Sequence, residues 1–172
     1  MPTIITGVAS DETVSVKWVP TIADVNAPKL ATEINAAPSV TLECLLTETF
    51  SPDASAEVGV VRRMCSKQVQ QRGGTVTLTI EDLIYAYDPQ GLTTAAINKA
   101  YAALVQGAKG YLVVRWGKHV DTAWAVGDKV DVWPVEISYG PVKLAPEANS
   151  ELKAKSGVLV TGTVATDKAI VT

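Results

Sequence analysis

The sequence predicts a mainly β protein: an antiparallel sandwich or barrel-like sheet with one flanking α-helix, in a single domain over residues 1–172. Valine and threonine, whose branched side chains favour strands, account for 24 and 18 of the 172 residues. Apolar and polar residues alternate in several stretches, most regularly over 75–80, which is typical of strands. The expected strands follow one another in runs instead of alternating with helices, and this order indicates antiparallel pairing.

Composition and charge narrow the function classes. Hydrophobic residues make up 47% of the chain and charged residues 19%, which is typical of a protein that buries a core. The net charge of −3 lacks the basic excess that nucleic-acid binders usually carry. No apolar run approaches about 18 residues, so we expect no membrane span. The first residues also lack the basic and apolar regions of a secretory signal.

Strands are expected from local periodicity. Residues 13–19 alternate and end at Pro20, so they predict a half-buried strand. Further strands are expected at 40–46, 58–66, 75–80, 110–117 and 129–139, with a last hairpin at 150–165. Strand 110–117 is apolar enough to be covered on both faces.

The main helix is expected at about residues 94–106. Thr93 or Thr94 is expected to cap its start, and Gly107 suits the left-handed position after its end. A second, short helix is expected at 29–35. In the main helix, apolar residues recur at spacings of three and four and form one stripe: Ile97, Ala100, Tyr101, Leu104 and Val105.

Glycine and proline residues predict turns and strand edges. The Arg72-Gly73-Gly74 sequence predicts the turn between strands 58–66 and 75–80, and Ser156-Gly157 predicts the turn of the last hairpin. Pro134 lies inside an expected strand and has no N–H to donate. It therefore predicts an edge strand or a bulge.

Three peripheral pieces have weak periodicity: an N-terminal arm at 1–12, a long loop at 47–57, and a C-terminal segment at 141–172 that starts with a proline-containing linker. Burial within one subunit is not expected to hold the N-terminal arm, the loop and the tail after Thr166. We expect these three parts to be mobile in a free subunit and ordered in an assembly.

The sequence contains no recognisable catalytic motif. The single histidine, His119, follows an expected strand, and no Gly-x-Ser-x-Gly motif presents a serine nucleophile. Cys44 and Cys65 lie in apolar segments and are interpreted as reduced core thiols, with a disulfide as the alternative. Two cysteines and one histidine are too few ligands for a typical zinc site. We therefore expect no catalytic residue, cofactor or metal.

Several residues are candidates for contacts between subunits. Arg62 and Arg63 are adjacent on an expected strand, where neighbours point to opposite faces. They are not expected to form one patch, and one of them is expected to meet an acid at an interface. Trp124 lies in an expected loop, and Phe50 and Asp53 lie in the 47–57 loop.

An ordered set of short stretches carries a resemblance to a known family. The stretches begin with KWVPTIAD at 17–24 and YDPQ at 87–90, and continue with KGYLVVRWG at 109–117 and KVDVWPVE at 129–136. From about residue 14 to 165, the chain resembles the major tail tube proteins of phages with long, non-contractile tails that infect actinobacteria.

This resemblance implies a β-sandwich with a flanking helix and no catalytic residues. It implies hexameric rings that stack into a tube, through which double-stranded DNA passes without specific binding. The implied partners are other copies of the chain, the tape measure protein and other tail proteins. The implied location is the virion tail, assembled in the cytoplasm of the host bacterium.

A tube wall that passes DNA is expected to be uncharged or acidic, because basic groups gain affinity by releasing counterions from phosphates. Two strand faces fit this expectation, each polar and opposite an expected core face: Thr41 and Glu43, opposite Val40, Leu42 and Cys44, and Thr75, Thr77, Thr79 and Glu81, opposite Val76, Leu78 and Ile80. An ordinary outer solvent face fits equally well. Alternative functions are a tail terminator or head-decoration protein, a small hydrolase, or a cytosolic ligand-binding β-barrel.

Overall fold

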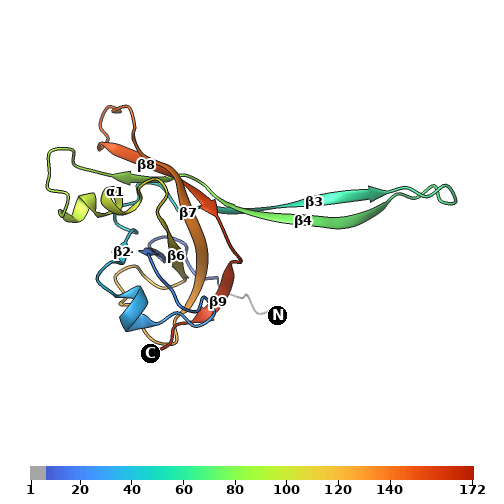
Figure 1. The fold of residues 1–172 in the computed structure, drawn as a ribbon, viewed down its shortest axis with the longest axis horizontal. Helices are drawn as coiled ribbons and strands as arrows, with labels where there is room; N and C mark the ends of the chain where they lie inside the picture. The colour runs from blue at the N-terminus through green and yellow to red at the C-terminus, as the bar shows by residue number, and fades with distance from the viewer. Residues whose placement is uncertain (1–6) are drawn as a thin grey trace, which may run out of the picture.

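The computed structural model describes residues 7–172, and a curled antiparallel sheet with a long two-stranded arm makes up most of it (Figure 1). The predicted mainly β fold with one short flanking α-helix is confirmed. The helical segments are the π-helical turn η1 (Leu30–Ile34), the 3₁₀ turn η2 (Ala96–Asn98) and α1 (Lys99–Ala103). The strands are β1 (Val14–Val19), β2 (Val40–Thr41), β3 (Pro52–Val61), β4 (Gln70–Ile80), β5 (Leu83–Ala86), β6 (Lys109–Trp116), β7 (Lys129–Lys143), β8 (Lys153–Val160) and β9 (Ala165–Ala169).

The main sheet has the order β2-β1-β6-β7-β8-β5, with β9 pairing beside β7. Every pairing is antiparallel; Val16, for example, lies opposite Val114, and Val113 lies opposite Val132. β6 lies near the middle, and both faces of its central residues are buried, as the sequence predicts.

Residues 40–47 connect the two edges of this sheet and close it into a barrel-like shape. β2 pairs with β1, and the Leu42 N–H donates to the Val16 carbonyl at 2.8 Å. The chain then turns, and the Thr47 N–H donates to Ile84 of β5 at 2.9 Å. The prediction of one continuous strand over 40–46 is therefore wrong, because this segment must cross from one edge to the other. Leu42 faces inward as expected, but Cys44 is exposed.

Two apolar clusters stabilise the body, one on each face of the sheet. The larger cluster lies inside the curl and includes Trp18 and Leu112. The second lies on the outer face, where Val19 and Val113 pack against Ile34 and Ile170. β1 is therefore buried on both faces, whereas the sequence predicts a half-buried strand. The tail after Thr166 was expected to be mobile in a free subunit. Instead, this part of the chain belongs to β9, which pairs with β7, and Ile170 is only 1% exposed.

Pro134 lies in a central strand, so the expectation of an edge strand is wrong. β7 pairs with β6 on one side, and on its other side the partner changes from β9 near Val132 to β8 near Val135. Pro134 falls at this change of partner, where no ladder N–H is required, and its carbonyl accepts a hydrogen bond from Thr161 at 2.9 Å.

The last hairpin turns later than predicted. Ser156 and Gly157 lie inside β8, and the connection to β9 lies at 161–164. Ser156 is fully buried: its hydroxyl bonds the Tyr85 hydroxyl at 2.8 Å and donates to the Leu104 carbonyl at 2.9 Å. Ser156 can make both hydrogen bonds only from within β8 in the body, not from an exposed turn. The expected linker at 141–149 also begins later, because β7 continues to Lys143.

The flanking helix is shorter than the predicted 94–106, because η2 and α1 together cover only 96–103. No side chain caps either element, so the expected cap from Thr93 or Thr94 does not form. Its stripe is buried only at the centre: Ala100 and Leu104 are fully buried, whereas Ile97 and Val105 are exposed. Gly107 adopts a φ of +80°, as predicted, and its N–H donates to the Ile137 carbonyl at 2.8 Å.

Replacing Leu104 by alanine is expected to lower the free energy of unfolding by about 2–3 kcal/mol, because it leaves a cavity between α1 and the sheet. The short helix can move inward, which keeps the loss in the lower part of the usual range. Val105→Ala, at the exposed neighbour, is the matched control and is expected to change it by less than about 1 kcal/mol. Urea unfolding measures both; equal losses would contradict the packing described here.

Removing the Tyr85 hydroxyl is expected to cost about 1 kcal/mol, the usual net value of a buried hydrogen bond. Burial raises the pKa of Tyr85 to about 12, so the hydroxyl stays protonated at neutral pH. Tyr85→Phe keeps the ring, and Ser156 retains its bond to Leu104. A Tyr85→Phe variant as stable as the parent chain in urea would show that the hydroxyl pair contributes nothing net.

Candidate assembly surfaces

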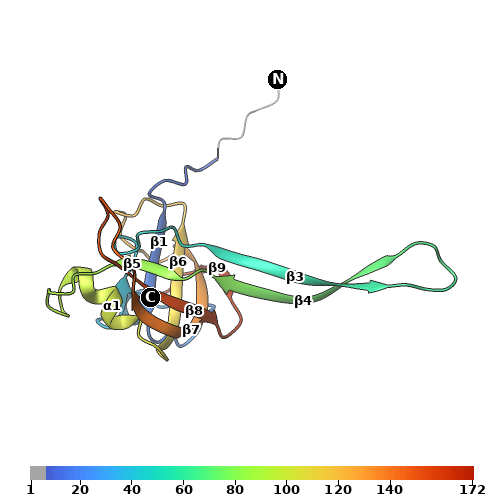
Figure 2. The same ribbon diagram turned by 90° about the horizontal axis from the view of Figure 1, so that it is seen from above.

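The β3–β4 arm (residues 52–80) is a two-stranded sheet separate from the main sheet. It projects far from the body in two perpendicular views (Figures 1 and 2). This arm corrects three predictions. The 47–57 segment is a loop only until Pro52, the strand at 58–66 ends at Val61, and Gly73 and Gly74 lie inside β4 instead of in a turn. The turn of the hairpin falls at 62–69.

The arm exposes apolar side chains and two open strand edges. Val58, Val60 and Val76 are each more than half exposed, and Met64 is fully exposed. An isolated two-stranded hairpin is only marginally stable in water, and unpaired edges attract other chains. The arm therefore has the properties of a surface that is covered by another molecule in an assembly.

The outer arm (residues 58–73) is basic. It contains four basic residues and no acidic residue: Arg62, Arg63, Lys67 and Arg72. All four side chains are exposed, and none forms an ion pair with another residue in the part of the chain that the structure describes. Arg62 and Arg63 lie in the turn instead of on a strand, so the argument that they face opposite sides is wrong. The run of basic residues without acids was visible in the sequence.

The inner part of the arm has two unlike faces. Cross-strand pairing places Asp53 opposite Thr79 and Ser55 opposite Thr77, which makes one face polar. The other face carries Ala54 opposite Leu78 and Ala56 opposite Val76. Thr75, Thr77 and Thr79 are exposed, as is Glu81 just beyond β4. The expected core face is confirmed only near the body: Ile80 is buried and Leu78 is partly buried against the larger apolar cluster, whereas Val76 is exposed, so the expectation is wrong for Val76.

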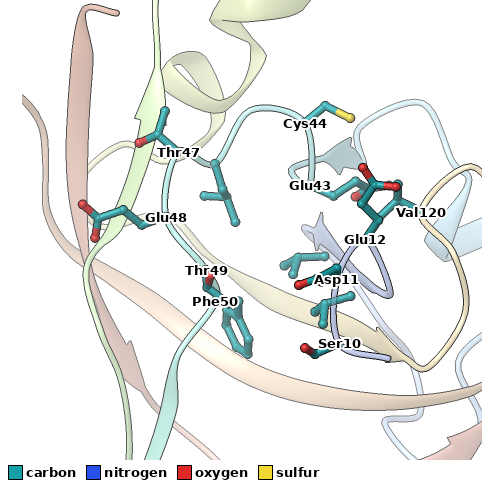
Figure 3. Close-up of a pocket in the computed structure, with 13 residues that line it drawn as sticks. Ser10, Asp11, Glu12, Glu43, Cys44, Thr47, Glu48, Thr49, Phe50 and Val120 are labelled. Carbon is teal, nitrogen blue, oxygen red and sulfur yellow. The ribbon is translucent and has the colours of Figure 1, made fainter. Parts of the chain in front are cut away.

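A hollow of about 410 Å³ lies in the body between the N-terminal segment and the chain that leads into β3 (Figure 3). Four acidic residues line it, with no lysine or arginine among its lining residues: Asp11, Glu12, Glu43 and Glu48. We call this feature the acidic hollow. Figure 3 shows Asp11, Glu12 and Glu43 on one side of the hollow, whereas Glu48 lies on the other side with its carboxylate directed away from it. Val14, Leu46 and Phe50 contribute an apolar part of its lining.

Glu43 is the least exposed carboxylate of the acidic hollow. Burial raises the pKa of its carboxyl, while a backbone hydrogen bond and the nearby Lys17 ammonium oppose the shift. Its Oε2 atom is buried and has no hydrogen-bond partner among the described residues. Burial likewise lowers the pKa of Lys17, against the pull of Glu43. Thr41, the other candidate on this segment, is exposed in β2.

Two aromatic residues predicted to contact other subunits instead pack inside their own subunit. Phe50 is 5% exposed, and its ring packs at 6.3 Å from Trp133 and 6.4 Å from Trp116. Two cations lie near the ring of the buried Trp124: the Arg115 guanidinium is 4.9 Å and the Lys17 ammonium 5.0 Å from the ring centre. The loop positions suggested exposure, but both side chains fill gaps beside the strands. Asp53, by contrast, is exposed on the arm.

A buried ion-pair cluster fixes the loop that contains Trp124. Arg115 of β6 is 1% exposed and donates to Asp128 at 3.1 Å and to the Thr122 carbonyl at 2.7 Å. Lys118 pairs with the other oxygen of Asp128. Burial opposes ionisation of Asp128, but hydrogen bonds from Lys118, the Ala125 N–H and Arg115 outweigh it and lower its pKa. No sequence motif identified this cluster, because Arg115 sits in an apolar run.

Few groups suited to catalysis or metal binding come together. His119 lies in an exposed loop and contacts Glu12 at 3.0 Å. Both cysteines are free but exposed, which corrects the expectation of core thiols. Among residues 7–172, no three His, Cys, Asp or Glu side chains are grouped to hold a metal ion. Within the same residues, no helix has the length and apolar character needed to cross a membrane.

A closed β-body with a long projecting arm that exposes apolar side chains is typical of proteins that assemble through their surfaces. Comparison with known families supports this class: the sequence matches the family described as phage tail tube protein over residues 1–172. The chain belongs to the phage tail tube protein family. A comparison with curated proteins found no match.

Proposed function

We propose that copies of this chain form stacked rings, hexameric as the sequence resemblance implies, which build the tail tube of a phage with a long, non-contractile tail. The single observation that supports this most is the β3–β4 arm, which carries exposed apolar side chains far from the body. The proposed tube delivers the phage DNA. Its further partners are the tape measure protein and other tail proteins, and it assembles in the host cytoplasm.

The arm and the body are different surfaces, so a contact between them joins unlike faces of two copies. Such head-to-tail contacts either close into rings or continue as filaments. Stacked rings require two sets of contacts: one between neighbours within a ring and one between successive rings. The arm is long enough to reach the next ring, since ten residues of β3 at about 3.3 Å each extend it by roughly 30 Å.

We propose that the polar face at the inner part of the arm lines the channel. Thr75, Thr77 and Thr79 share this face with Asp53, and Glu81 follows β4. These residues include no lysine or arginine, so a wall built from them releases no counterions from DNA and lets the duplex slide. Thr41 remains a candidate for the wall, whereas Glu43 lies in the acidic hollow.

Electron microscopy of the purified full-length protein tests this function. Tubes, or stacks of rings, are the expected result. A single closed ring that never stacks would favour a tail terminator, and an oligomer that binds only capsids would favour a head-decoration protein. A protein that stays monomeric or dimeric at high concentration would contradict the assembly function and favour a cytosolic β-barrel or hydrolase.

A further inference from the structure

We propose that the outer arm of one copy docks into the acidic hollow of a second copy. This inference rests on the proposed function, because it names the receptor surface for the arm within the tube. The two surfaces belong to one chain, but among the residues that the structure describes no ion pair joins them.

The outer arm and the acidic hollow carry opposite charges. The outer arm presents four cations that form no ion pair within residues 7–172, and the acidic hollow has four acidic residues and no lysine or arginine in its lining. Asp11, Glu12 and Glu43 lie together on one side of the hollow (Figure 3), and Glu12 also contacts His119. Opposite charges of this kind steer encounter and set the register of an interface. The buried Oε2 of Glu43, which lacks a partner among the described residues, is an acceptor that an incoming arginine or lysine can satisfy.

Both surfaces also expose apolar side chains that can pack against each other. Besides its carboxylates, the hollow exposes apolar lining from Val14, Leu46 and Phe50. The outer arm carries the fully exposed Met64 and the half-exposed Val69 between its cations. Methionine adapts to irregular apolar gaps because its side chain is unbranched and flexible. Docking would cover apolar surface on both sides while it pairs the charges.

Geometry makes the contact intermolecular. Residues 47–50 line the hollow at the base of the arm, whereas the basic residues lie about ten strand positions further out, roughly 30 Å away. A paired hairpin of this length does not fold back onto its own base. Each copy offers one arm and one hollow. Because these are unlike surfaces, docking can continue from copy to copy around a ring or along a tube.

The two cysteines of the chain provide a direct test. Cys65 lies in the turn of the outer arm, and Cys44 lines the hollow; both are free and exposed. In assembled protein, a short bismaleimide is expected to join Cys65 of one copy to Cys44 of the next and to give a ladder of covalent oligomers. The matched controls are C44S and C65S. An assembly of either variant alone is expected to give no such ladder, and a mixture of the two is expected to give a covalent dimer.

Charge reversal provides the second test. R62E/R63E on the arm and D11K/E12K at the hollow are each expected to raise the critical concentration for assembly by about tenfold or more. Combining all four substitutions in one chain is expected to restore assembly, since it re-forms the pairs with the signs exchanged. The matched control is K99E/K129E, which reverses two exposed lysines on the body. An equal loss of assembly in that control would attribute the effect to overall charge and overturn the pairing.

The outcomes separate this inference from the proposed function. Tubes that form normally but give no Cys65–Cys44 link, and that tolerate both single-sided reversals, would overturn the docking and leave the tube function standing. Failure of the unmodified chain to assemble at all would contradict both. A ladder from the parent chain, a dimer only from the mixture and rescue by the combined reversal would establish the docking.

Discussion

A subunit without its arm is expected to fold and to fail completely in tube formation. The design replaces residues 55–77 by an Asn-Gly turn, which joins Ala54 to Leu78 at positions that already pair across the two strands. Phe50 and Ile80 stay in place, so the larger apolar cluster remains intact. Electron microscopy is expected to show no tubes at concentrations where the parent chain assembles fully.

The melting midpoint is the control for this deletion, and it is expected to stay close to that of the parent chain. Deleting 47–57 instead would be uninformative, because it removes the buried Phe50 and the first half of β3. Normal tubes from the shortened subunit would contradict the role of the arm. A shortened subunit that is unfolded at room temperature would show that the arm stabilises its own body.

Removing the Asp128 carboxylate is expected to lower the free energy of unfolding by about 3–5 kcal/mol, because it leaves the Arg115 guanidinium buried without its counter-charge. The loss would also free the loop that Arg115 holds through the carbonyls of Thr122 and Ala123. Asp121→Ala, in the same loop at a largely exposed side chain, is the matched control and is expected to change stability by less than about 0.5 kcal/mol. Urea unfolding of both variants measures the difference.

Asp128 also predicts a pH dependence. Its pKa is lowered in the folded state, so its contribution to stability is fully present above the unfolded-state pKa of about 3.9. The contribution is lost as the pH falls through the folded-state pKa. Stability of the parent chain is therefore expected to decline below about pH 4, and Asp128→Asn is expected to flatten that decline. Parallel curves for the two proteins would show that Asp128 does not titrate as described.

The sequence predicted correctly those elements whose structure depends on the local residue pattern. β1, β6 and the start of β7 were found because alternation or a continuous apolar run is strong there. The predictions were wrong where hydrogen bonds between segments distant in sequence determine the structure. Residues 40–46 look like one strand but are divided between two sheet edges, and Ser156 looks like a turn residue but is held in β8 by Tyr85 and Leu104.

The candidate surfaces were predicted less well for a related reason. Exposure was inferred from loop position, yet Phe50 and Trp124 fill apolar gaps beside strands that are distant in sequence. The hairpin itself was predicted, but its strands were placed too short and its turn at 72–74, because Ser, Asp and Gly residues in 51–59 and at 73–74 are typical of turns. Cross-strand pairing over many residues extends both strands through these positions. The acidic hollow joins residues 10–12 with 43–50, and no local pattern places these segments together.

A cryo-electron microscopy map of the assembled tube is the most direct test of the account. We predict that each β3–β4 arm lies against the body of another copy, with the outer arm at the acidic hollow. We also predict that the channel wall carries Thr75, Thr77 and Thr79 and no lysine or arginine. Arms that project freely from the outside of the tube, or a channel lined by basic side chains, would contradict this account.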